Sequence, residues 1–128
     1  MEAPTLSKRE RLFSRKLIET LFSGGSSQSM AAFPVRAVYI IKERAHEEPP
    51  VQLLVSVSKR HFKHAVDRNR VKRQIREAYR QNKQILTDAV PESHQLLIAL
   101  IWLAAEHYPS CEIEKRVVRL LQRIAEKL

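Results

Sequence analysis

Acidic residues are almost missing from one segment of this 128-residue chain, although the chain as a whole is not short of them. Residues 59–83 contain ten Lys or Arg and two acids, a net charge of +8 out of +9 for the whole chain. Residues 1–58 carry a net +2 and residues 84–128 a net −1. Acids normally balance a solvated helix face, so their absence here favours a polyanionic partner.

Cysteine and long apolar runs are also scarce. The single cysteine, Cys111, excludes an intramolecular disulfide and is typical of a reducing compartment. The longest apolar run, residues 96–105, has ten residues, about half of what a bilayer span needs. No signal-like segment opens the chain. We therefore expect one domain over residues 1–128, in the cytoplasm and without a membrane partner.

Patterns that carry catalysis or bind metals are poorly represented. There is no P-loop, no G-x-G-x-x-G and no triad-like motif. His61 and His64 have a ligand-like spacing, but no Cys or acid completes a zinc site. Asp67 and Glu77 lie among arginines, so they do not resemble a carboxylate cage for Mg²⁺. We expect no catalytic residue and no metal ligand in this chain.

Hydrophobic periodicity predicts helices and strands in the order α-β-β-α-β-α. The first helix contains Leu17, Ile18 and Leu21, could be capped by Ser14, and ends at Gly24-Gly25. The other predicted elements are strands at 35–41, 51–58 and 95–103, a helix from 64 or 67 to 86, and a helix from 110 to 128. Residues 26–32, 42–50 and 87–93 are predicted to be loops.

The basic segment reads as an amphipathic helix. At 100° per residue, an apolar stripe faces the core and a row of cations lies on the adjoining face. The stripe consists of Val71, Ile75, Ala78, Tyr79, Asn82 and Leu86. The row consists of Asn69, Lys72, Arg73, Arg76, Arg80 and Lys83. Arg70 lies away from this row, beside Glu77, with which it could pair. Arginine predominates, and its guanidinium group suits bidentate contacts with phosphate.

The first two predicted strands each have one wholly apolar side and one mixed side. The apolar sides, which carry Val35 to Ile41 and Val51 to Val57 at alternate positions, should cover the core. The mixed sides carry Arg36 and Val38 on one strand and Ser56 on the next. If these sides coincide, they form a half-polar trough that could hold single-stranded nucleic acid. An ordinary solvent-facing sheet surface is an equally good reading of the pattern.

Two motifs together resemble the protein component of bacterial ribonuclease P. Ser56-Val57-Ser58-Lys59-Arg60 matches the family's strand end S-x-S-K-[KR], and residues 68–77 match its RNR-x-KR-x-x-R-E helix. Arg11-Leu12, Phe22 and Gly25 resemble the family's N-terminal R-L…F…G segment, although Ile18 stands where the family often has an aromatic residue.

The resemblance implies a two-layer α/β (α+β) sandwich with a small mixed sheet and an unusual left-handed crossover. It also implies the non-catalytic protein subunit of a ribonucleoprotein endoribonuclease. The family binds a catalytic RNA, expected here at 1:1, which uses Mg²⁺ to remove the 5′ leader of precursor tRNA. The residues implied for the catalytic RNA are Lys59, Arg60, Arg68, Asn69, Arg70, Lys72, Arg73, Arg76 and Arg80. The residues implied for the leader cleft are Arg11, Phe22, Arg36, Val38 and Ser56.

Two alternatives start from the same charge. A structural RNA-binding protein, such as a ribosomal protein, shares the basic helix but does not account for S-x-S-K-R followed by RNR-x-KR. A helix that enters the DNA major groove needs base-reading side chains and usually a dimer. This helix offers mostly long cations that suit a phosphate backbone, so we expect no DNA partner.

Overall fold

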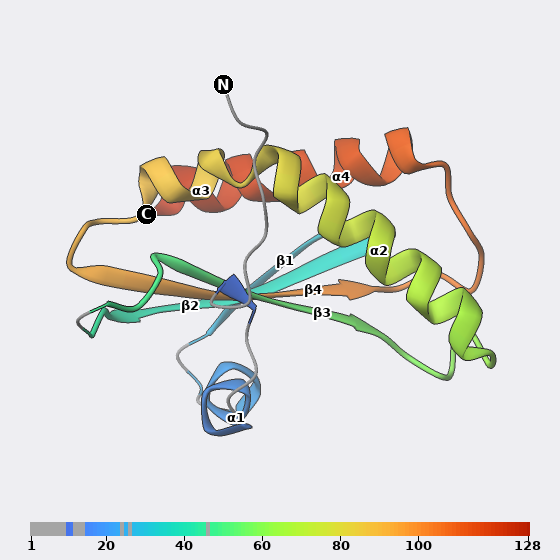
Figure 1. Cartoon of the computed structure of the whole chain (residues 1–128), viewed down its shortest axis with the longest axis horizontal. Helices are drawn as coiled ribbons and strands as arrows, with labels where there is room; N and C mark the ends of the chain where they lie inside the picture. The colour runs from blue at the N-terminus through green and yellow to red at the C-terminus, as the bar shows by residue number, and fades with distance from the viewer. Residues whose placement is uncertain (1–9, 12–14, 24, 26, 46) are drawn as a thin grey trace.

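The computed structural model describes residues 10–11, 15–23, 25, 27–45 and 47–128 (Figure 1). These residues form one four-stranded sheet and four helices. In chain order the elements are α1 (Arg15–Ser23), β1 (Gln28–Ala32), β2 (Val35–Glu43), β3 (Val51–Val57), α2 (Ala65–Asn82), α3 (Gln84–Ala89), β4 (His94–Trp102) and α4 (Ser110–Lys127). None of these helices is long and apolar enough to cross a membrane.

The sheet is mixed, with the strand order β1-β2-β4-β3. β2 is antiparallel to both of its neighbours, whereas β3 and β4 are parallel. Parallel neighbours require a crossover connection, and here α2 and α3 supply it. Figure 1 shows α2, α3 and α4 on one face of the sheet and α1 on the other. The predicted two-layer α+β architecture with a mixed sheet is confirmed.

The main core lies between the sheet and the layer of α2, α3 and α4 (Figure 1). The predicted apolar sides of β2 and β3 face it, except that Ile41 at the far end of β2 is 39% exposed. From α2 the core receives Val71, Ile75, Ala78 and Tyr79. These positions recur at three and four residues, so the predicted helical stripe is the surface that packs on the sheet.

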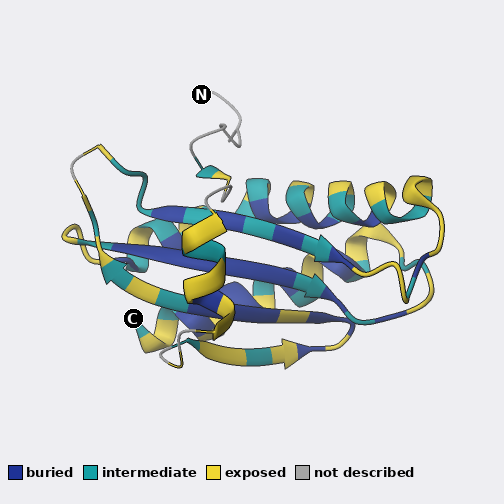
Figure 2. Ribbon diagram, turned by 90° about the horizontal axis from the view of Figure 1, so that it is seen from below, coloured by how far each residue is buried: buried dark blue, intermediate teal, exposed yellow. Residues whose placement is uncertain are grey.

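A smaller apolar cluster lies on the opposite face, beneath α1. Leu21 of α1 is fully buried there against Val38, Leu97 and Ala99 of the sheet. Figure 2 shows α1 lying across this face of the sheet. α1 therefore covers the middle of the face that the sequence predicted to be a mixed, open surface.

Two of the predicted secondary-structure assignments were wrong. Residues 28–32 were predicted to be loop, but they form β1, an edge strand that pairs with β2 from Ala32↔Val35 to Gln28↔Tyr39. Its sequence, QSMAA, lacks β-branched residues and most of it is exposed, so register with β2 rather than local propensity places it. The long basic helix ends at Asn82, and α3 follows over residues that were partly predicted to be loop. The proposed cap Ser14 lies outside the described residues.

Candidate nucleic-acid interface

The α2 flank opposite α4 carries the predicted row of cations. Contacts on the α4 side fix the rotation of the helix, because Gln74 Nε2 donates to the Tyr108 carbonyl at 3.2 Å and to Ser110 Oγ at 3.0 Å. Arg73 and Asn69 are exposed, while Lys72 and Arg76 are half-buried. With the apolar stripe held on the sheet, these side chains face the surface that continues beyond the edge strand β3.

The turn after β3, which leads into the start of α2, adds two cations. Lys59 and Arg60 are exposed, and the turn is closed by hydrogen bonds from the Arg60 and His61 amides to Ser58, at 3.0 Å to its hydroxyl and 3.1 Å to its carbonyl. The second serine of the S-x-S-K-R motif thus shapes the turn that presents its two cations. The motif has a local structural reason in addition to its charge.

The side chain of Arg68 is hydrogen-bonded within the protein, which its charge alone did not indicate. Its Nη1 atom donates to the carbonyls of Phe62 and Lys63, at 2.9 Å each. It therefore ties the loop between β3 and α2 to the first turn of the helix. A guanidinium group has five donors, so Arg68 retains others that could meet a phosphate.

The expected pairing of Arg70 with Glu77 was wrong. Glu77 instead accepts from Arg80 Nε at 3.0 Å and from Gln81 Nε2 at 2.9 Å. The hydrogen bond from Arg80, followed by that from Gln81, lowers the pKa of Glu77 to about 2, and the same pairing raises the pKa of Arg80. Arg70 is exposed and makes no ion pair with any described residue. The structure therefore leaves the charge of Arg70 more available than that of Arg80.

A further cluster that the sequence did not predict fixes the start of α2. The ring of Phe62 stacks on that of His107 with centroids 4.6 Å apart, and His107 Nε2 lies 3.0 Å from Asp67 Oδ1. These contacts join the loop before α2 to the loop after β4. His107 is 40 residues from Asp67 in the chain, so no local pattern could have indicated the pair.

The predicted leader residues do not all lie together. Across the sheet, Arg36 and Ser56 flank Ile101 in register, so these two occupy one row on the α1 face. Arg36 is exposed and donates from Nε to Ser29 Oγ at 2.9 Å, and Phe22 of α1 is 48% exposed. Val38, by contrast, is buried beneath α1, so it supports the helix and does not form an accessible floor.

Arg11 lies away from the other predicted leader residues. It forms a parallel bridge with Leu53 at the outer edge of β3. Leu53 belongs to the main core, and residues paired in register share a face of the sheet. Arg11 is therefore on the α2 side, whereas Arg36 and Ser56 are on the α1 side.

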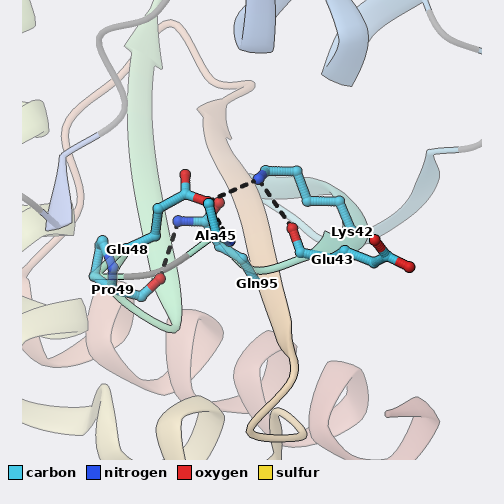
Figure 3. A network of polar contacts seen from close by, with 6 residues as sticks. All are labelled: Lys42, Glu43, Ala45, Glu48, Pro49 and Gln95. Atoms are coloured by element: carbon cyan, nitrogen blue, oxygen red, sulfur yellow. Dashed lines mark hydrogen bonds and ion pairs between the residues drawn. The ribbon is translucent and has the colours of Figure 1, made fainter.

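A polar network holds the β2–β3 connection at the other end of the sheet (Figure 3). Glu48 accepts from the Ala45 amide at 2.6 Å and from Lys42 Nζ at 3.3 Å, and its pKa is lowered chiefly by the first of these bonds. The fully buried Gln95 donates to the Pro49 carbonyl at 2.9 Å. This end is acidic and distant from the S-x-S-K-R turn, and within the described ranges no three His, Cys, Asp or Glu side chains could together hold a metal ion.

Comparison with known proteins identifies the family. Residues 6–125 match the family model described as Ribonuclease P. The chain belongs to the ribonuclease P protein family. The ribonuclease P protein component of Porphyromonas gingivalis is 38% identical over 121 residues, which cover 94% of this chain and 86% of that protein. That of Chlorobium phaeobacteroides is 36% identical over 131 residues, covering 94% and 88%.

Solved structures of ribonuclease P proteins have the same fold. The Thermotoga maritima protein superposes with a TM-score of 0.64 at 20% identity, covering 89% of this chain and 96% of that one. A Staphylococcus aureus protein also gives 0.64 at 20% identity, with 91% and 95% covered. The predicted family and the predicted role as the protein subunit of ribonuclease P, an endoribonuclease of tRNA processing, are confirmed.

Arg68 and Arg70 should respond differently to removal. We expect Arg68→Ala to lower the free energy of unfolding by about 1–3 kcal/mol, because two loop carbonyls lose a charged donor. Arg70→Ala should change it by less than about 0.5 kcal/mol, as exposed substitutions generally do. Urea unfolding of the RNA-free protein measures both, and equal stabilities for the two variants would contradict the assignment of Arg68 to the loop.

Proposed function

We propose that this chain binds the catalytic RNA of ribonuclease P through the α2 flank and the turn after β3, and the 5′ leader of precursor tRNA across the α1 face. The observation that carries the first part is the row of exposed or half-buried cations on one side of a helix whose other side is anchored in the core. Lys72 and Arg73 of this row have no acid paired with them among the described residues, and neither has Arg70, which lies away from the row.

The physical contribution of such a surface is electrostatic. Cations that meet RNA phosphates release condensed counterions, so binding is favourable and weakens as salt rises. They also lower the repulsion between RNA segments that Mg²⁺ otherwise screens. We therefore propose that the protein alone cleaves nothing and that it raises the activity of the RNA most at low Mg²⁺. Mg²⁺ bound to the RNA would supply the activated water and stabilise the leaving oxygen.

Support for the leader site comes from the α1 face of the sheet. Arg36 offers a cation, Ser56 a hydroxyl donor and acceptor, and Phe22 an accessible ring. Single strands are held by such combinations of phosphate contact and base stacking. With the protein between its RNA and the leader, we propose a 1:1 complex that acts in the cytoplasm.

A structural RNA-binding role, as in a ribosomal protein, is the alternative from the sequence. The match of the family model across residues 6–125 favours ribonuclease P instead. Co-purification distinguishes the two, because ribonuclease P predicts one abundant structured RNA and not ribosomal RNA.

The main experiment is reconstitution with the cognate catalytic RNA. We expect Arg73→Ala to weaken RNA binding by about 1–3 kcal/mol and to flatten the log–log salt slope by about 0.7–0.9, the value for one lost phosphate contact. Arg119→Ala is the charge-matched control, since Arg119 is exposed on α4. Affinity and slope are measured by filter binding across a salt series. Equal losses of affinity for both variants would show that α2 contributes only through the net charge of the protein. Cleavage of precursor tRNA by RNA-free protein would refute the proposal that the protein alone cleaves nothing.

The leader site is tested by comparing two substrates on the reconstituted holoenzyme. Phe22→Ala should weaken precursor tRNA binding by about 1–3 kcal/mol, the loss expected for one stacked base, and Arg36→Ala should also weaken it. Both variants should bind mature tRNA as the wild type does, because mature tRNA has no leader. An equal loss for the two substrates would place these residues in the fold or the RNA interface instead.

A further inference from the structure

Two arginines from distant parts of the chain lie on the same side of β3. Arg11 pairs with Leu53 along the outer edge of this strand, on the side of the sheet that α2 covers. Arg76 projects from the flank of α2 opposite Gln74, and Gln74 contacts the loop that leads into α4. Arg76 therefore faces the β3 edge, where Arg11 lies. The sequence motifs had assigned these two residues to different sites.

An ion pair holds Glu10 against the same flank. Lys83 Nζ lies 2.8 Å from Glu10 Oε2 and 3.0 Å from Glu10 Oε1, and both side chains are about one-fifth exposed. Lys83 follows Arg76 by seven residues, which is two helical turns, so both side chains are on one face. Because Glu10 precedes Arg11 directly, this pair fixes where Arg11 can lie relative to Arg76.

The positive charge of Arg11 disfavours the charged form of Arg76. The pKa of Arg76 is lowered by its partial burial and, secondly, by the charge of Arg11. No described carboxylate forms an ion pair with either arginine, since the nearby Glu10 is bound to Lys83. Holding two like charges together costs free energy, and an anion between them would offset that cost.

We propose that Arg11 and Arg76 together hold one backbone phosphate of RNA, and that the Glu10–Lys83 pair positions Arg11 for this contact. Guanidinium groups bind phosphate oxygens through paired N–H donors, so two of them can surround one phosphate group. This inference rests on the proposed RNA-binding function and refines it. It transfers Arg11 from the leader cleft on the α1 face to the α2 flank, beside the edge strand β3.

A mutant cycle on the reconstituted holoenzyme tests whether one phosphate is shared. Arg11→Ala and Arg76→Ala should each lower the affinity of the protein for the RNA that supplies the phosphate by about tenfold. That is the scale of one charged hydrogen-bonding contact. The double variant should lose little more than either single variant. Its salt slope should flatten by about 0.7–0.9, the value for one phosphate. Additive losses with about twice that change in slope would show two separate contacts and overturn the proposal.

The positioning role of Glu10 has its own readout. Glu10→Gln should weaken RNA binding in the wild-type background and have no further effect in the Arg11→Ala background, since it acts only through Arg11. The same loss in both backgrounds would overturn this role. Unfolding of the free protein provides the control: Arg11→Ala should be at least as stable as the wild type, because it removes a repulsion.

Two RNAs could supply the phosphate, and two arms of the experiment distinguish them. A loss in binding to the catalytic RNA alone assigns the phosphate to that RNA. A loss confined to precursor tRNA, compared with mature tRNA, assigns it to the leader. No loss in either arm overturns the clamp. Wild-type protein and Arg73→Ala in the same assay test the proposed function separately. If the proposed function were wrong, the wild-type protein itself would not bind the RNA.

Discussion

The packing of α2 on the sheet is the contact on which the rest of the structure depends. Val71 and Ile75 are completely buried, and Ala78 and Tyr79 nearly so. Burying each large side chain contributes about 1.5–3 kcal/mol, which outweighs the weak repulsion between exposed cations on the same helix. Because the apolar stripe can face only the sheet, the cations can face only outward. Rotation of the helix, and not any single charge, therefore defines the interface.

The cations of the basic segment fall into two groups with different physical roles. Arg68, Arg80 and Lys83 are engaged within the protein, with loop carbonyls, Glu77 and Glu10 respectively. These contacts fix both ends of α2 and hold Glu10 beside it. Exposed Arg70 and Arg73, together with the turn at Lys59 and Arg60, remain available to a polyanion. A count of charges from the sequence cannot separate the groups, because it does not show which cations have partners. Those of Arg68 and Arg80 lie three to six residues away, whereas Glu10 lies 73 residues from Lys83.

Periodic patterns were predictable from the sequence, whereas pairings across the chain were not. The α2 stripe and the alternating faces of β2 and β3 follow from local spacing, and the structure has both. The strand β1 has almost no intrinsic strand signal and depends on its register with β2. Likewise, Leu21 covers Val38 only because α1 crosses the sheet. The alternation of side chains along β2 therefore predicted which face Val38 is on, but not that this face is covered there. The position of Arg11 on the α2 side was unpredictable for the same reason, because its bridge partner Leu53 lies 42 residues away in the sequence.

The central claim is that burial of the stripe presents the cations, and it is tested most directly by separating stability from RNA affinity in Ile75→Ala. The account predicts a loss of about 2–5 kcal/mol in the free energy of unfolding, as for other large-to-small core substitutions. Affinity for the catalytic RNA per folded molecule should be nearly unchanged. Val66→Ala, which alters a side chain of α2 that is 79% exposed, is the matched control and should leave both quantities near wild type. Wild-type stability of Ile75→Ala, or a loss of affinity in fully folded protein as large as that of Arg73→Ala, would contradict the account.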